Sequence, residues 1–135
     1  MMNKKTIVAA ALLLVTGIAH AEDGVQYSEY QAIQAIAQCG YIANTMMSDN
    51  TAQVMDLSLK KYVAITKRMT PGGYDPSPAD LATDYALFFQ QTVSDTESEM
   101  FDQIRKRGLP LEPGSWVLVA RDWWTVKSCN LITRL

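Results

Sequence analysis

Histidine is nearly absent from this sequence, since His20 is the only one among 135 residues. Imidazole is the usual proton shuttle near neutral pH and the commonest metal ligand. The chain also lacks a haem attachment motif, a phosphate-binding loop, zinc-ligand spacings, an EF-hand loop and a serine nucleophile elbow. These absences argue against most enzyme classes, and we expect a protein that is not an enzyme and that uses no cofactor or metal.

The position of His20 matters because residues 1–21 have the form of a secretory signal peptide. Lys4 and Lys5 precede the apolar run "TIVAAALLLVTGIA", which is too short to span a bilayer comfortably. The run ends at Ala19-His20-Ala21, a small-x-small cleavage pattern. Cleavage after Ala21 would remove the histidine and leave residues 22–135 as a single periplasmic domain without a membrane anchor.

Basic residues are in the minority after this cleavage. Removing Lys4 and Lys5 from 12 basic residues leaves 10 against 14 acidic ones, so the formal charge moves from −2 to −4. Nucleic acids and anionic membranes both attract basic patches. We therefore expect no nucleic-acid partner, whereas a basic protein partner is allowed.

The chain has only two cysteines, Cys39 and Cys129. In an oxidising compartment such thiols tend to pair, so we expect one disulfide. A nucleophilic cysteine is the alternative, but it needs a base, and the processed chain would hold no histidine.

Apolar residues at helical spacing divide the rest of the chain into helices. The first expected helix covers residues 28–47, with a capping box at Ser28 and Gln31, and the second ends near Met69. Pro78 and Gly108 bracket a third segment, whose polar centre "SDTESE" predicts either one kinked helix or two helices. A last helix follows Ser115 and includes Cys129, because its apolar spacing persists for four turns, although "WVLV" alone would also suit a strand. The predicted fold is all-α: a small helical bundle clamped by a disulfide between its first and last helices.

The expected apolar stripes are specific enough to be checked. Helical spacing selects Ile33, Ile36, Ala37, Gly40, Ala43 and Met47; then Met55, Leu59, Tyr62, Thr66 and Met69; then Ala82, Tyr85, Phe89, Val93, Met100 and Ile104; and finally Trp116, Val119, Ala120, Trp123, Val126 and Cys129.

Two features could carry chemistry or sugar binding. Asp95, Glu97 and Glu99 could include a glycosidase acid/base pair, but a hydrophilic run is more often a solvated helix face that could steer a basic partner. The Trp123-Trp124 pair could stack on a sugar or a base. More often, such a pair is one core residue and one partly exposed residue.

The segments "YSEYQAIQAIAQCGYIANTMM" and "VKSCNLITRL" resemble the periplasmic immunity proteins that protect bacteria from type VI secreted cell-wall amidases. The shared features are a tyrosine-rich first helix with a cysteine (Tyr27, Tyr30, Cys39 and Tyr41) and a second cysteine near the C-terminus (Cys129). The resemblance implies a protein that binds an amidase effector and occludes its catalytic cleft. It also implies a homodimer that inserts a loop or helix end into the enzyme.

The stiff segment "PGGYDPSP" suits such an insertion, with Gly72, Gly73, Tyr74 and Asp75 as expected partner-binding residues. An inert connection between helices is an equally good interpretation. Two other classes stay open. A pilotin-like secretion accessory usually carries a lipid-anchor cysteine where this chain has Glu22, and an envelope-stress chaperone would expose apolar surface on acidification.

Overall fold

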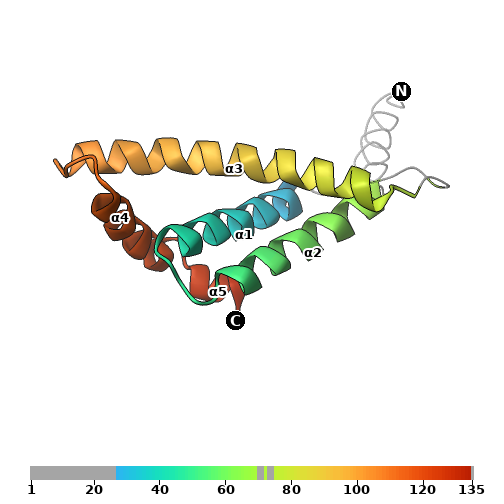
Figure 1. Ribbon diagram of the computed structural model, residues 1–135. Helices are drawn as coiled ribbons and strands as arrows, with labels where there is room; N and C mark the ends of the chain where they lie inside the picture. The colour runs from blue at the N-terminus through green and yellow to red at the C-terminus, as the bar shows by residue number, and fades with distance from the viewer. Residues whose placement is uncertain (1–26, 70–71, 73–74, 135) are drawn as a thin grey trace, which may run out of the picture.

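The computed structural model describes residues 27–69, 72 and 75–134, which fold into a wedge of helices without strands (Figure 1). The predicted leader, residues 1–21, lies outside this range. Among the described residues, no helix combines the length and apolar character needed to cross a membrane. The elements in chain order are α1 (Tyr27–Thr45), α2 (Thr51–Met69), α3 (Pro78–Lys106), α4 (Pro113–Val126) and α5 (Cys129–Thr133).

Helix α1 is the centre of the fold, because it packs against each of the other four helices. Its expected stripe is buried from Ile33 to Ala43, whereas Met47 lies beyond the helix and is exposed. Ser28 lies inside α1 and is therefore not its cap. Gly40 allows α2 to approach closely, since a Cβ there would lie 2.7 Å from Met55 Sδ.

The buried face of α2 differs from the expected one. Val54, Ser58 and Ile65 are buried, while Leu59 and Met69 are exposed. Met55, Tyr62 and Thr66 of the expected stripe are half-buried. Spacing of apolar residues missed Ser58 because it is polar. A buried hydroxyl is stable there because it has a hydrogen-bond partner, the Tyr85 hydroxyl at 3.1 Å.

The segment from Pro78 to Lys106 is one uninterrupted helix, which resolves the choice between one helix and two. Ser77 is its N-cap, and its side chain accepts a hydrogen bond from the backbone N–H of Asp80. At the other end, Gly108 has a φ of 67°. The Leu109 and Gly108 amides donate to the carbonyls of Ile104 and Arg105, so the helix ends in a Schellman motif.

The polar centre of α3 does not break the helix, because its one buried hydroxyl is hydrogen-bonded and its other polar side chains are exposed to solvent. Thr96 is only 1% exposed, and its hydroxyl donates to the Thr92 carbonyl one turn earlier at 2.7 Å. Ser94 is in the helix interior and is not a second cap. The inner face of α3 combines apolar and hydroxyl side chains: Leu81, Phe88, Thr92, Thr96, Met100 and Ile104. The expected Ala82 is exposed.

The last expected helix is two helices. Helix α4 begins at Pro113 and ends at Val126, which is 76% exposed and not part of the buried stripe. Ser128 adopts the left-handed conformation, and α5 starts at Cys129. The pair at Trp123 and Trp124 divides as expected into one buried and one partly buried ring.

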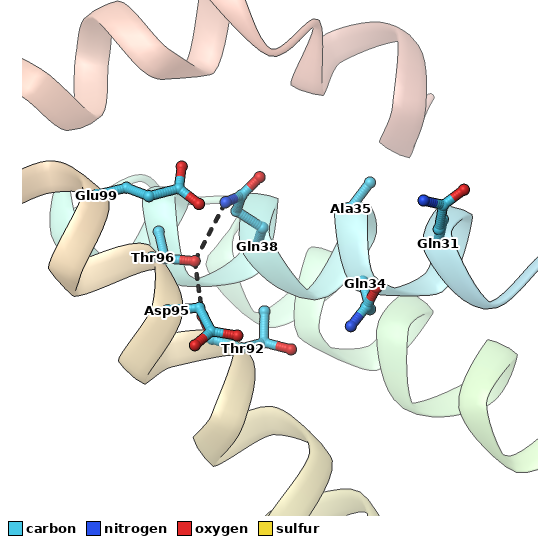
Figure 2. A pocket seen from close by; sticks show the side chains of 8 residues that line it. All are labelled: Gln31, Gln34, Ala35, Gln38, Thr92, Asp95, Thr96 and Glu99. Carbon is cyan, nitrogen blue, oxygen red and sulfur yellow. Dashed lines mark hydrogen bonds between the residues drawn. The ribbon is translucent and has the colours of Figure 1, made fainter. Parts of the chain in front are cut away.

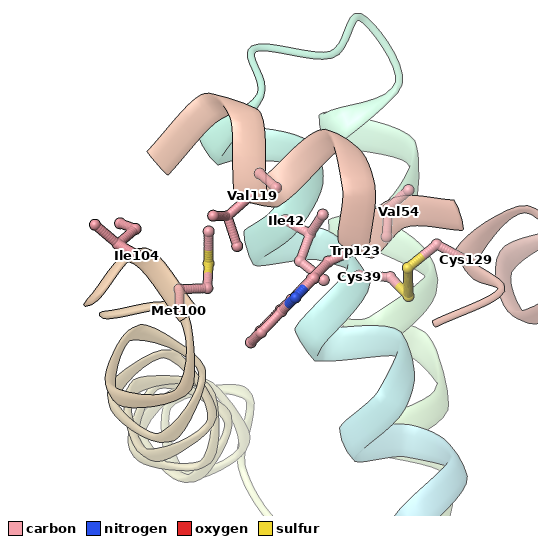
Figure 3. Packing of buried hydrophobic residues seen from close by; sticks show 9 residues of the cluster. Cys39, Ile42, Val54, Met100, Ile104, Val119, Trp123 and Cys129 are labelled. Atoms are coloured by element: carbon pink, nitrogen blue, oxygen red, sulfur yellow. A yellow bond between two sulfur atoms is a disulfide. The ribbon is translucent and has the colours of Figure 1, made fainter. Parts of the chain in front are cut away.

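The predicted disulfide is present between Cys39 of α1 and Cys129 of α5, with a Cα–Cα distance of 5.7 Å. It lies in the larger of two core clusters, where α1, α2, α3 and α4 contribute Ile42, Val54, Met100 and Val119 (Figure 3). The disulfide therefore connects the first and last helices through the interior.

The smaller cluster lies at the other end of the wedge and is mostly aromatic. Phe88 is within ring contact of Tyr30, Tyr62 and Tyr85, with the closest ring centroids 4.7 Å apart. Ile33, Ala37 and Ile65 complete it. Together the two clusters hold α3 against α1, but polar side chains occupy the stretch between them.

Candidate functional site

A polar groove of about 290 Å³ lies between α1 and α3 at this stretch. Its walls come from two helices only, and Figure 2 shows their side chains facing one another across the opening. The lining is Gln31, Gln34, Ala35, Gln38, Thr92, Asp95, Thr96 and Glu99. Primary amides and carboxylates thus dominate its chemistry.

The α1 wall carries three glutamines at Gln31, Gln34 and Gln38. Their spacing of three and four residues places them on one face of the helix. The Gln38 amide nitrogen donates to Thr96 Oγ1 across the groove at 3.2 Å, which is drawn as a dashed line in Figure 2. This bond orients Gln38 and leaves its carbonyl oxygen as an acceptor.

The α3 wall has a buried floor and a charged rim. Thr92 and Thr96 form the floor, and both hydroxyls donate to carbonyls of the helix itself. Asp95 and Glu99 form the exposed rim. Asp95 accepts a hydrogen bond from Gln91 at 2.9 Å, and Glu99 pairs with Lys127 at 3.6 Å.

The structure separates Glu97 from the two other acidic residues predicted for the site. Its carboxylate accepts a hydrogen bond from the Tyr41 hydroxyl at 3.1 Å. It lines a second, more open recess of about 420 Å³ that includes Phe101 and Trp116. Partial burial and the neighbouring Glu97 carboxylate raise the pKa of Tyr41, although a hydrogen bond with Thr45 opposes this. Tyr41 therefore stays neutral and donates to Glu97.

The predicted loop residues that the structure describes, Gly72 and Asp75, do not line the groove. Gly72 and Asp75 are exposed in the connection between α2 and α3, while Gly73 and Tyr74 lie outside the described residues. Asp95 is 17 residues beyond Pro78, which corresponds to roughly 25 Å along a helix. Asp75, which lies in the connection before α3, and the acidic rim, which lies within α3, are thus on two separate surfaces.

The three glutamines were not among the residues predicted for a site. Their signal was visible, because "QAIQAIAQ" alternates amides with the apolar stripe at helical spacing. Amides carry no charge and match no catalytic motif, so only the facing carboxylates of α3 make them part of a site. The groove depends on which two helices lie side by side, and helical spacing within α1 does not contain that information.

Helix α3 exposes six carboxylates, two near its N-terminus and four between Asp95 and Asp102. Within the described chain, Glu99 is the only one of its six carboxylates in an ion pair. No basic residue occurs on α3 before Arg105. The six are Asp80, Asp84, Asp95, Glu97, Glu99 and Asp102. They give α3 a net negative potential that favours a positively charged partner.

The groove offers hydrogen-bond donors, hydrogen-bond acceptors and negative charge to a ligand. In the part of the chain that the structure describes, no three residues of the metal-ligating types are grouped so that they could hold a metal ion. Asp95 and Glu99 are exposed, whereas a glycosidase acid needs an apolar cleft that raises its pKa. Compared with known proteins, the chain matches no family model, no curated protein and no solved structure.

Proposed function

We propose that the processed chain is a periplasmic binding protein that inhibits a cell-wall amidase, as the resemblance to type VI amidase immunity proteins implies. One observation supports this function best: within the described residues, α3 has six exposed carboxylates, of which one is in an ion pair, and they lie beside and along an amide-lined groove. Electrostatic complementarity accelerates encounter with a basic partner, and hydrogen bonds in a groove then provide specificity. The partner is thus a protein with a positively charged surface around its catalytic cleft.

The chain's reactive groups support an inhibitor in preference to an enzyme. Both cysteines are in the disulfide, so neither is a thiolate nucleophile. The only histidine belongs to the predicted leader. The buried disulfide agrees with export to an oxidising compartment.

The experiment uses purified residues 22–135 and an amidase encoded beside this chain's gene. We expect no peptidoglycan hydrolysis by the chain alone and complete inhibition of the amidase at an equimolar ratio. Light scattering on the complex gives the stoichiometry and tests the homodimer. Failure to bind any amidase of the same genome would contradict the proposal and favour a secretion-accessory role.

A further inference from the structure

The geometry points to one occupant for the groove between α1 and α3: an extended, positively charged polypeptide segment of the partner. The assignment rests on the proposed function, because that function supplies a protein partner. It adds the place where the partner is held and the conformation of the segment. Three properties of the groove lead to it: length, amide content and charge.

The length of the glutamine row matches a short extended peptide. Gln31 and Gln38 are seven residues apart, which is about 10 Å along a helix. An extended chain rises about 3.3 Å per residue, so three residues cover that distance. The row can therefore contact three consecutive peptide units.

The side-chain amides of the groove favour a bound segment whose backbone N–H and C=O groups are unpaired. A primary amide both donates and accepts, as a peptide group does. Among the described residues, the side-chain amides of Gln31 and Gln34 have no hydrogen-bond partner, and the side chain of Gln38 keeps a free carbonyl oxygen. A helical segment of a partner would leave these amides unused, since its own backbone groups are already paired. Extended backbone has unpaired N–H and C=O groups that match them.

The negative charge of the groove favours basic side chains on the bound segment. Asp95 and Glu99 face the glutamine row from α3 (Figure 2). In the described part of the chain, Asp95 has no ion pair, and Glu99 shares a single contact with Lys127. A lysine or arginine of the bound segment would pair with Asp95, whereas an acidic segment would be repelled.

The test uses the mature protein and two capped peptides, Ala-Arg-Ala-Arg-Ala and Ala-Glu-Ala-Glu-Ala, followed by amide shifts in NMR titrations. We expect only the basic peptide to bind, with shifts confined to Gln31–Gln38 and Thr92–Glu99. Asp95→Asn and Gln34→Ala should each weaken binding by about threefold to tenfold. The matched controls Asp49→Asn and Gln53→Ala are exposed and lie outside the groove. They should change the affinity less than about twofold, as surface substitutions away from the contact do.

Three outcomes would overturn the assignment: shifts on another face, equal effects of the groove and control variants, or binding of cell-wall peptides in place of the basic peptide. The proposed function fails separately. If the parent protein, Asp95→Asn and Gln34→Ala inhibit an amidase equally, the groove is not the binding site, but the inhibitor function stands. If the groove binds the basic peptide and no amidase is inhibited, the groove assignment stands and the inhibitor function is wrong.

Discussion

The hydroxyl of Tyr85 on α3 donates a hydrogen bond to Ser58 Oγ on α2 across 3.1 Å. Ser58 is fully buried and Tyr85 belongs to the aromatic cluster, so this polar contact lies in an otherwise apolar part of the core. A buried hydroxyl without a partner is costly, and the pair therefore fixes how α2 and α3 approach one another.

Tyr85→Phe tests this contact. The change removes the donor and leaves Ser58 Oγ without its partner from α3, so we expect the free energy of unfolding to fall by about 1–2 kcal/mol. Urea denaturation followed by circular dichroism measures it. Tyr27→Phe is the control, because Tyr27 is 73% exposed. An equal effect of both variants would show that the Tyr85 contact contributes nothing.

Alkaline pH should destabilise the fold. Burial is the main cause that raises the pKa of Tyr41, Tyr62 and Tyr85 above 10.0. As pH rises through 10, the unfolded chain loses these protons before the folded chain does. The folded state then binds more protons, so the free energy of unfolding decreases with pH.

Urea denaturation at pH 8, 10 and 11 should show full stability at pH 8 and a progressive loss above pH 10. Tyr85→Phe should make this slope shallower, because it removes one of the tyrosines whose pKa is raised. Stability that rises between pH 10 and 11 would contradict the burial of these hydroxyls.

The disulfide is expected to contribute a large part of the net stability. It closes a loop with a sequence separation of 90, which corresponds to about 4–5 kcal/mol in the chain-entropy model. Cys39→Ala combined with Cys129→Ala should lower the free energy of unfolding by a similar amount. Alkylation of the non-reduced parent protein, read by mass spectrometry, should find no free thiol; labelling of both cysteines would disprove the bridge.

Ser77→Ala and Ser94→Ala form a matched pair on α3. Ser77 caps the helix, so its loss should cost about 1 kcal/mol. Ser94 lies in the helix interior and is exposed. Alanine there should be neutral or stabilise by a few tenths of a kcal/mol. A loss of about 1 kcal/mol from Ser94→Ala would indicate a helix start at Ser94 and thus a broken α3.

The exposed carboxylates of α3 should act on the association rate. Asp84→Asn combined with Asp102→Asn removes two exposed charges outside the groove. We expect slower association with the amidase, by about threefold at low salt, and a nearly unchanged dissociation rate. Asp49→Asn combined with Asp56→Asn removes the same charge elsewhere. Surface plasmon resonance at two ionic strengths separates the two rates, and equal rates for both double variants would exclude steering by α3.

Local signals in the sequence determined the first two helices, both ends of α3 and the disulfide. Ser77 and Pro78 start α3, and Gly108 ends it, because capping and the left-handed conformation depend on residues that are adjacent in the chain. Cys39 and Cys129 could pair only with each other. These features need no knowledge of which helices are neighbours.

Tertiary structure decided the buried face of α2, the continuity of α3 and the groove. Ser58 and Thr96 are buried because Tyr85 and Gln38, distant in the chain, supply hydrogen bonds. Apolar periodicity treats such hydroxyls as solvent-facing, so it missed Ser58 and predicted a kink or a break at the polar segment. The left-handed conformation of Ser128 separates α4 from α5, and α5 places Cys129 beside Cys39 of α1. The Ser58 hydroxyl has its partner on another helix, and Thr96 accepts a bond from α1 in addition to the bond within its own helix. Only the packing of the helices supplies these partners.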